Sequence, residues 1–316
     1  MENDAMTEQE LEKALRTAAE ADVAVIFAGL PEIFESEGYD RTSMKLPKCQ
    51  DRLIEEVLKV QPNVVVVLHN GSPVELPWAD RVSAILEMYL GGQGVGEACD
   101  WLLFGEANPS GRLAETFPYR LEDNPSYLHF PGNGKRVLYG EDIFVGYRYY
   151  DTKKVPVRYA FGHGLSYTEF AYGDLNLSSA QMTDEDILTV SFKVKNTGKT
   201  EGKEVVQLYV ADLCGISERP VKELKGFAKV HLLPGEEKTV SMEISARDLS
   251  YYEERLGDWY APSGTYRILI GHASDDVRLH ADIIFETQKE LPLCVDFTTT
   301  FGELLDHTKT APVITE

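Results

Sequence analysis

The sequence lacks long hydrophobic runs and has few basic residues for its size. Its 316 residues include 31 lysines and arginines against 52 aspartates and glutamates, which gives a net charge of −21. No stretch approaches the roughly 18 apolar residues of a membrane-spanning helix, so we predict none. The negative charge would repel nucleic-acid phosphates and anionic lipid headgroups. We therefore expect neither nucleic acid nor a membrane as a partner.

The sequence also lacks a recognisable signal peptide, because residues 1–20 are acidic and favour a helix. Its four cysteines stand far apart, and their spacing matches neither a metal site nor a disulfide framework. They are Cys49, Cys99, Cys214 and Cys294. We interpret them as isolated reduced thiols, which favours a cytoplasmic location but leaves export open.

Several catalytic motifs are missing as well. No H-E-x-x-H or similar spacing occurs, so we predict no metal site, and no G-x-S-x-G elbow indicates a serine hydrolase. Gly92-Gln93-Gly94 precedes a predicted helix, but the third glycine is misplaced for a dinucleotide-binding loop. Tight packing of a helix on a strand explains these glycines better, and we predict no cofactor. We interpret His163, which lies between two glycines, as a packed or hydrogen-bonded histidine at a domain junction.

The first half of the chain alternates helical and strand patterns. In order, the pattern predicts a helix within residues 1–20, a strand at 23–27, a helix at 49–61, strands at 63–68 and 83–90, and a helix ending near 104. Thr7 and Glu10 form a capping box at the start of the first helix. The continuous apolar run of the first strand predicts burial on both faces. This alternation predicts a mostly parallel sheet with helices on its faces, in a domain that looks incomplete at its start.

From about residue 174 the pattern changes to apolar residues that alternate with polar ones, which predicts half-buried strands separated by turns. We predict an antiparallel sandwich. The predicted domains are an α/β domain at 1–172, the sandwich at 173–288 and a tail at 289–316. Phe301, Leu304 and Leu305 favour one helical turn in the tail. That turn could contact another domain or subunit, so a homo-oligomer is left open.

An acidic loop follows the first predicted strand and holds three carboxylates and an arginine. Its sequence is Glu35-Ser36-Glu37-Gly38-Tyr39-Asp40-Arg41. A glycine-bearing loop can hold a carboxyl group over a cleft, as proton delivery to a leaving-group oxygen requires. Taken by itself, the loop could equally be a solvated acidic stretch.

Five motifs in order give this loop a context. They are Glu37-Gly38-Tyr39-Asp40-Arg41, Asn70-Gly71-Ser72-Pro73-Val74, the stretch from Gly105 to Pro118, Val145-Gly146-Tyr147-Arg148-Tyr149-Tyr150-Asp151, and Phe161-Gly162-His163-Gly164-Leu165-Ser166-Tyr167. Together they resemble family 3 glycoside hydrolases, the β-glucosidase group. The sandwich that follows resembles the fibronectin type III-like domain of many members. We therefore predict a partial α/β domain followed by an immunoglobulin-like fibronectin type III β-sandwich.

The resemblance implies a retaining hydrolysis of terminal, non-reducing β-D-glucosyl residues in a β-glucoside or oligosaccharide. By motif position, Glu37 would be the acid/base carboxyl. In retaining enzymes this group stands about 5 to 5.5 Å from the nucleophile. We interpret Asp40 and Arg41 as an ion pair that holds the loop, with direct contact to the sugar as the alternative.

The family carries its nucleophile, an aspartate, on a separate (β/α)8 barrel that this chain lacks. Asp100-Trp101 and Asp258-Trp259 fall in a helix and on a sandwich loop, where neither is a credible nucleophile. We therefore expect the C-terminal part of a β-glucosidase that needs a barrel domain or chain as its partner and is inactive, or nearly so, alone. The alternative is a non-catalytic carbohydrate-binding or interaction module derived from such a hydrolase.

Overall fold

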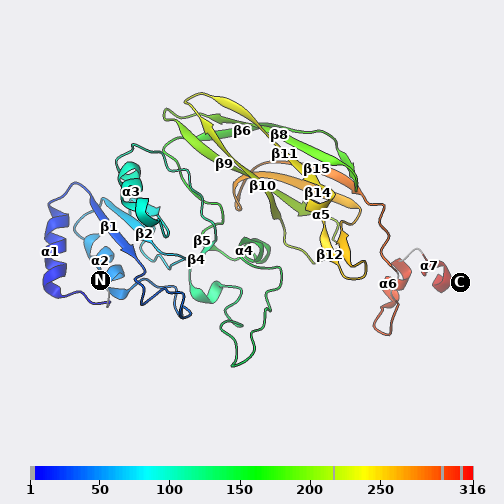
Figure 1. The fold of residues 1–316 in the computed structure, drawn as a ribbon, viewed down its shortest axis with the longest axis horizontal. Helices are drawn as coiled ribbons and strands as arrows, with labels where there is room; N and C mark the ends of the chain where they lie inside the picture. The colour runs from blue at the N-terminus through cyan, green and yellow to red at the C-terminus, as the bar shows by residue number, and fades with distance from the viewer. Residues whose placement is uncertain (1–3, 216–217, 293–294, 307–308, 316) are drawn as a thin grey trace.

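The structure is a computed structural model that describes residues 4–215, 218–292, 295–306 and 309–315. Figure 1 shows a part of strands and helices on the N-terminal side, a β-sandwich beside it, and a short helical tail that extends away from the sandwich. Among the described helices, none is both long and apolar enough to cross a membrane. Cys49, Cys99 and Cys214 are free thiols, whereas Cys294 lies outside the described residues.

Three parallel strands form the N-terminal sheet in the order β1-β2-β3, as predicted. They are β1 (Ala24–Gly29), β2 (Val64–His69) and β3 (Ala84–Glu87). Helices α1 (Glu8–Ala19) and α2 (Lys48–Val57) share one hydrophobic core with this sheet. The predicted capping box is confirmed at the start of α1, where Thr7 Oγ1 accepts from the Glu10 N–H and the Glu10 carboxylate accepts from the Thr7 N–H.

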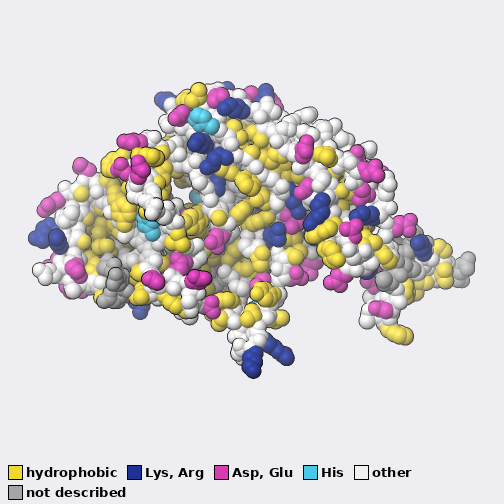
Figure 2. All heavy atoms as spheres, in the orientation of Figure 1, with side chains coloured by type: hydrophobic (Ala, Val, Ile, Leu, Met, Phe, Trp, Pro, Cys, Tyr) yellow, Lys and Arg dark blue, Asp and Glu magenta, His cyan; other side chains and the backbone are white. Residues whose placement is uncertain are grey.

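The prediction that the first strand is buried on both faces is wrong. Ile26 and Ala28 point into the core and are 9% and 5% exposed, but Val25 and Phe27 on the other face are 41% and 60% exposed. Side chains alternate between the two faces of a strand, and α1 and α2 cover only one of them. Figure 2 also shows hydrophobic side chains at the surface over α3 (Val95–Leu103).

A long connection joins the sheet to the sandwich. Its short elements are η1 (Gly92–Gly94), α3, β4 (Phe117–Pro118), η2 (Leu121–Asp123), α4 (Tyr147–Lys153) and β5 (Val157–Tyr159). Strands β4 and β5 pair antiparallel. The loop of residues 124–146 projects below the body of the molecule in Figure 1. The helix predicted after the glycines is confirmed. It consists of the short 3-10 turn η1 followed directly by α3.

Two packed sheets form the sandwich, with the orders β10-β9-β14-β15-β7 and β11-β8-β6. The strands are β6 (Phe170–Leu177), β7 (Gln181–Thr183), β8 (Ile187–Asn196), β9 (Gly202–Asp212), β10 (Glu223–Leu232), β11 (Glu237–Ser245), β14 (Gly264–Ala273) and β15 (Asp276–Glu286). All pairings are antiparallel except that of β7 with β15. The predicted domain division at residue 172 falls inside β6.

Smaller elements lie between two strands of the sandwich, β11 and β14, and in the tail that follows β15. Helix α5 (Ala246–Leu249) precedes the hairpin of β12 (Tyr251–Glu253) and β13 (Asp258–Tyr260), and the tail contains α6 (Phe301–Asp306) and α7 (Ala311–Thr315). The helical turn predicted at Phe301 is thus confirmed as α6.

A buried carboxylate holds the connection against the sandwich. Glu204 on β9 is fully buried and accepts from Arg112 Nη2 at 2.7 Å and from the Tyr172 hydroxyl at 2.7 Å. His272 on β14 completes the cluster, with Nδ1 2.5 Å from Glu204 Oε1 and Nε2 2.8 Å from the Gly164 carbonyl oxygen. A buried charge is stable only when it is paired and hydrogen-bonded, and this one is. The cluster therefore fixes the connection relative to both sheets of the sandwich.

Candidate active site

Glu37 lies in a short turn of the loop between β1 and α2. Ser36 and Tyr39 pair as an isolated antiparallel bridge, and the Gly38 N–H donates to Ser36 Oγ at 3.4 Å. The Tyr39 hydroxyl donates to the Glu32 carbonyl oxygen and ties the turn back to the start of the loop. The Glu37 side chain is exposed, and no described residue forms a hydrogen bond or ion pair with its carboxylate. The carboxylate is therefore free to meet a group that comes from outside this chain.

Glu35 anchors this turn to the segment that follows β2. Its carboxylate accepts from the Gly71 N–H at 2.6 Å and from Ser72 Oγ at 2.6 Å. Arg41 Nη1 lies 3.4 Å from Glu35 Oε1 and also donates to Ser72 Oγ at 2.5 Å and to the Pro73 carbonyl oxygen at 3.3 Å. The two ends of the Glu37 turn are thus fixed to the same short segment.

The expected ion pair between Asp40 and Arg41 does not form. Arg41 pairs with Glu35 instead, and Asp40 is exposed. The Arg41 and Glu35 side chains are only 16% and 20% exposed. Partial burial and a shared hydrogen-bond partner favour this pair, whereas an exposed pair with Asp40 would contribute little. Arg41 therefore holds the loop through a different acid from the one we predicted.

A second carboxyl group, that of Glu87 at the end of β3, is close enough to Glu35 for their charges to interact. Burial raises its pKa from 4.5 to about 7, and repulsion by Glu35 and Glu115 acts in the same direction. The Tyr89 N–H and the Asn70 side-chain amide donate to the Glu87 carboxylate at 2.8 and 3.2 Å, which opposes the rise. Glu87 is therefore a carboxyl group that holds its proton up to about neutral pH.

Glu115 completes the group of carboxylates around Arg41. Burial raises the pKa of Glu115, and the charge of Glu35 adds to the rise, while Arg41 opposes it. Burial also lowers the pKa of Arg41, against the attraction of Glu35 and Glu115. One guanidinium thus lies among several partly buried acids.

Sequence reasoning singled out Glu37 as a candidate but did not predict the contacts of Glu35, Glu87 and Glu115. One signal was available for Glu87: the carboxyl ends of parallel strands meet at one edge of a sheet, where ligand sites gather. Glu87 ends β3, and Asn70 directly follows β2. The contact between Glu35 and Gly71 joins residues 36 positions apart and had no local signal.

The two Asp-Trp pairs lie away from these acids. Asp100 and Trp101 are exposed on α3. Asp258 lies on β13 of the sandwich, where its carboxylate accepts from Lys289 Nζ at 2.8 Å, and the guanidinium of Arg247 lies over the Trp259 ring. Neither aspartate is brought to the Glu37 turn.

His163 packs near the domain junction. Its ring stacks on Tyr159 at 4.9 Å between centroids, and burial lowers its pKa. This matches the predicted packed histidine. Within the described part of the chain, no three His, Cys, Asp or Glu side chains gather as a metal site would require.

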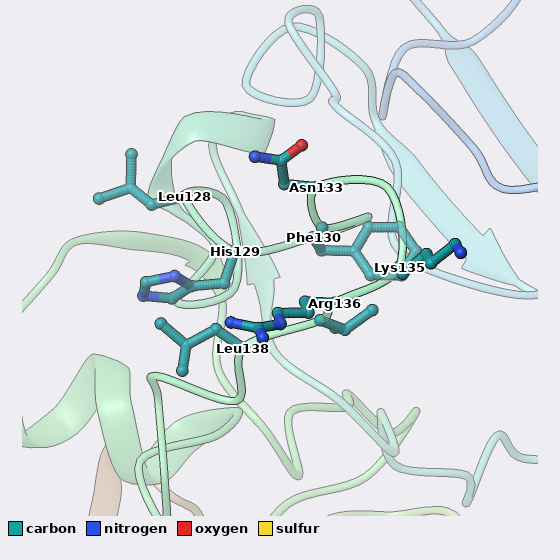
Figure 3. A pocket seen from close by; sticks show the side chains of 9 residues that line it. Leu128, His129, Phe130, Asn133, Lys135, Arg136 and Leu138 are labelled. Carbon is teal, nitrogen blue, oxygen red and sulfur yellow. The ribbon is translucent and has the colours of Figure 1, made fainter.

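Residues 128–138 of the projecting loop line an open hollow of 640 Å³ (Figure 3). Figure 3 shows His129 beside Leu138 on one side of the loop, with Phe130 and Lys135 on the other. Leu128, Phe130 and Leu138 are exposed. None of the residues lining this hollow carries a buried polar atom that lacks a partner. We assign no ligand to it.

Comparisons with known proteins show which proteins the chain is similar to. Residues 1–167 match the glycosyl hydrolase family 3 C-terminal domain, and residues 204–274 match a fibronectin type III-like domain. The thermostable beta-glucosidase B of Acetivibrio thermocellus is 55% identical over 283 residues, which cover 90% of this chain and 38% of that protein. The beta-glucosidase of Kluyveromyces marxianus is 45% identical over 286 residues, which cover 90% of this chain and 33% of that protein.

Solved structures show the same relationship. The crystal structure of the Bifidobacterium adolescentis GH3 beta-glucosidase superposes with a TM-score of 0.91 and 38% identity, covering 98% of this chain and 46% of that one. The Kluyveromyces marxianus enzyme in complex with glucose gives a TM-score of 0.84 and 42% identity, covering 89% of this chain and 34% of that one. The chain thus spans between a third and a half of the length of these relatives. It belongs to glycoside hydrolase family 3 and corresponds to the C-terminal part of its β-glucosidases.

Proposed function

We propose that this chain supplies the acid/base carboxyl group of a retaining β-glucosidase and that this group is Glu37. The observation that carries the proposal is an exposed, unpaired carboxylate on a turn fixed at both ends, within the motif that the family uses for this role. The substrate would be a neutral β-glucoside or oligosaccharide with a terminal, non-reducing β-D-glucosyl residue. A neutral substrate suits a chain with a net charge of −21.

In the proposed mechanism Glu37 acts twice. Its protonated carboxyl group first gives a proton to the glycosidic oxygen while a carboxylate nucleophile attacks the anomeric carbon. The resulting Glu37 carboxylate then takes a proton from water as that water attacks the glycosyl intermediate. The cycle returns Glu37 to its protonated form and releases glucose.

The nucleophile would come from a (β/α)8 barrel, as a domain or as a separate chain. A general acid must hold its proton at the working pH. Docking of a barrel would remove water from the Glu37 carboxyl group and bring a second carboxylate close to it, and both changes favour the protonated form. Alone, the chain would then be inactive or nearly so. The alternative role of Asp40 and Arg41, direct contact with the sugar, stays a prediction.

The test is hydrolysis of an aryl β-glucoside by this chain, by the barrel portion of a relative, and by the two mixed. We expect activity only in the mixture. With cellobiose, whose leaving group needs a proton, Glu37→Gln should lower the activity of the mixture by about 10² to 10⁴, while Glu32→Gln, an exposed carboxylate in the same loop, should leave it intact. Hydrolysis by this chain alone would show that the nucleophile lies here and would overturn the proposal. Association of the two parts without activity would favour a non-catalytic module.

A further inference from the structure

The hydroxyl group of Ser72 joins the two ends of the Glu37 turn. It donates to Glu35 Oε1 at 2.6 Å on the N-terminal side of the turn and accepts from Arg41 Nη1 at 2.5 Å on the C-terminal side. A hydroxyl group donates once and can also accept, so it can form both bonds at the same time. Because Glu37 lies between Glu35 and Arg41 in the chain, this one hydroxyl connects the residues that flank it.

This bridge is tighter than the direct ion pair between the two flanking residues. Arg41 Nη1 lies 3.4 Å from Glu35 Oε1, whereas charge-assisted N–H···O bonds are usually about 2.7 to 2.9 Å long. The two bonds of the Ser72 hydroxyl, at 2.5 and 2.6 Å, are both shorter than that contact. Much of the link between Glu35 and Arg41 therefore passes through Ser72.

The end of the parallel sheet fixes Ser72 itself. Asn70, which directly follows β2 and is 0% exposed, donates from Nδ2 to the Ser72 carbonyl oxygen at 3.0 Å and to the Glu87 carboxylate at 3.2 Å. Val74 is 1% exposed and packs in the core that the sheet shares with α1 and α2. The bridge thus ties the exposed Glu37 turn to the carboxyl ends of β2 and β3.

We propose that Ser72 is a positioning residue for the acid/base step, which holds the Glu37 turn where the reaction needs it; this inference rests on the role proposed for Glu37. A general acid must lie within about 2.6 to 3.2 Å of the oxygen that it protonates. A misplacement of about 1 Å can lower the rate on the order of 10²-fold. Within the described part of the chain, the Ser72 hydroxyl bonds to Glu35 and Arg41 and not to the Glu37 carboxylate, so it acts through them.

The test compares Ser72→Ala with wild type in the enzyme reconstituted with a barrel. The leaving group of cellobiose needs a proton, and that of dinitrophenyl β-glucoside does not. We expect kcat/KM of Ser72→Ala to fall by about 10- to 100-fold on cellobiose and by less than about 3-fold on the aryl glucoside. The inhibition constant of glucose should stay unchanged, because Ser72 acts on the position of Glu37 and not on the sugar.

Two variants serve as controls. Ser72→Thr keeps the hydroxyl group, and its added methyl group can be placed in the cavity of 340 Å³ that Ser72 lines, so this variant should keep most of the activity on cellobiose. Ser83→Ala removes the hydroxyl group of an exposed serine that directly precedes β3, and it should behave as wild type on both substrates.

Amide hydrogen exchange of the chain alone provides a second measurement that needs no barrel. Loss of the bridge in Ser72→Ala should make exchange in residues 36–41 about fivefold faster, the effect of one lost hydrogen bond. Ser83→Ala should leave exchange in these residues unchanged.

Three results would overturn the proposal. They are equal losses of Ser72→Ala on the two substrates, or none; a raised inhibition constant for glucose, which would mean that the hydroxyl contacts the sugar; and unchanged exchange in residues 36–41. The role of Glu37 is judged separately, by whether Glu37→Gln distinguishes the same two substrates. If Glu37→Gln distinguishes them and Ser72→Ala does not, only the positioning role is rejected.

Discussion

At the scale of single residues, the raised pKa of Glu87 predicts that the stability of the folded chain depends on pH. This pKa is about 7 in the folded chain and 4.5 ordinarily, so between these values the folded state holds a proton that the unfolded state has lost. Stability must therefore fall as the pH rises through this window. We predict that the free energy of unfolding decreases from pH 4.5 to 7, and that Glu87→Gln flattens this part of the profile because an amide does not titrate.

Urea denaturation at a series of pH values measures this effect. Glu32→Gln, at an exposed carboxylate, is the control and should keep the wild-type profile. A Glu87→Gln profile parallel to wild type would contradict the assignment of the proton to Glu87.

Residue roles were partly predictable from sequence. The Glu37 turn stands out because its composition and its motif are local. The partner of Arg41 was mispredicted because the choice between Asp40 and Glu35 depends on Ser72, which lies 31 positions further on and bonds to Arg41. Local sequence contains no information about such a contact.

At the scale of elements, the loop between β1 and α2 should depend on Glu35. Glu35→Ala removes the acceptor of the Gly71 N–H and the Ser72 hydroxyl and leaves Arg41 without its ion-pair partner. We predict a loss of about 1 to 3 kcal/mol in stability. Amide hydrogen exchange in residues 36–41 should also become faster. Glu32→Ala, in the same loop, should change neither quantity, and equal effects of the two substitutions would refute the anchoring role.

The two faces of β1 provide a matched pair. Ile26 is in the core and Phe27 is 60% exposed. We predict that Ile26→Ala costs about 2 to 4 kcal/mol, because it leaves a cavity. Phe27→Ala should cost less than about 1 kcal/mol in this chain, as exposed substitutions do. Chemical denaturation of both variants measures this, and a large loss for Phe27→Ala would mean that the face is covered.

Element types were predictable because helix and strand periods differ, but the burial of β1 was not. A run of apolar residues such as Val25-Ile26-Phe27 predicts burial wherever both faces have a cover. Only tertiary structure shows which cover is present. The hairpin of β12 and β13 was missed for a related reason, since its three-residue strands are too short to show a period.

At the scale of the whole molecule, the junction at Glu204 should set the coupling between the connection and the sandwich. Glu204→Ala leaves Arg112, itself 6% exposed at its side chain, buried without its acid. Breaking one partner of a buried pair costs about 3 to 5 kcal/mol. We predict that loss, together with separate thermal transitions for the α/β part and the sandwich in calorimetry.

Glu201→Ala serves as the control for this prediction. Glu201 lies three residues away, and its exposed side chain is 3.4 Å from His231. This substitution should shift the unfolding temperature little and leave a single transition. A single cooperative transition in the Glu204→Ala variant would show that other contacts hold the two parts together.

The most direct test of the central claim, that Glu37 is the acid/base, is how its loss depends on the leaving group. In the enzyme reconstituted with a barrel, kcat/KM of Glu37→Gln would be compared on cellobiose and on dinitrophenyl β-glucoside. A sugar leaving group needs a proton and dinitrophenolate does not, so kcat/KM on cellobiose should fall by about 10² to 10⁴ and on the aryl glucoside far less. Equal losses on the two substrates, or none, would contradict the account.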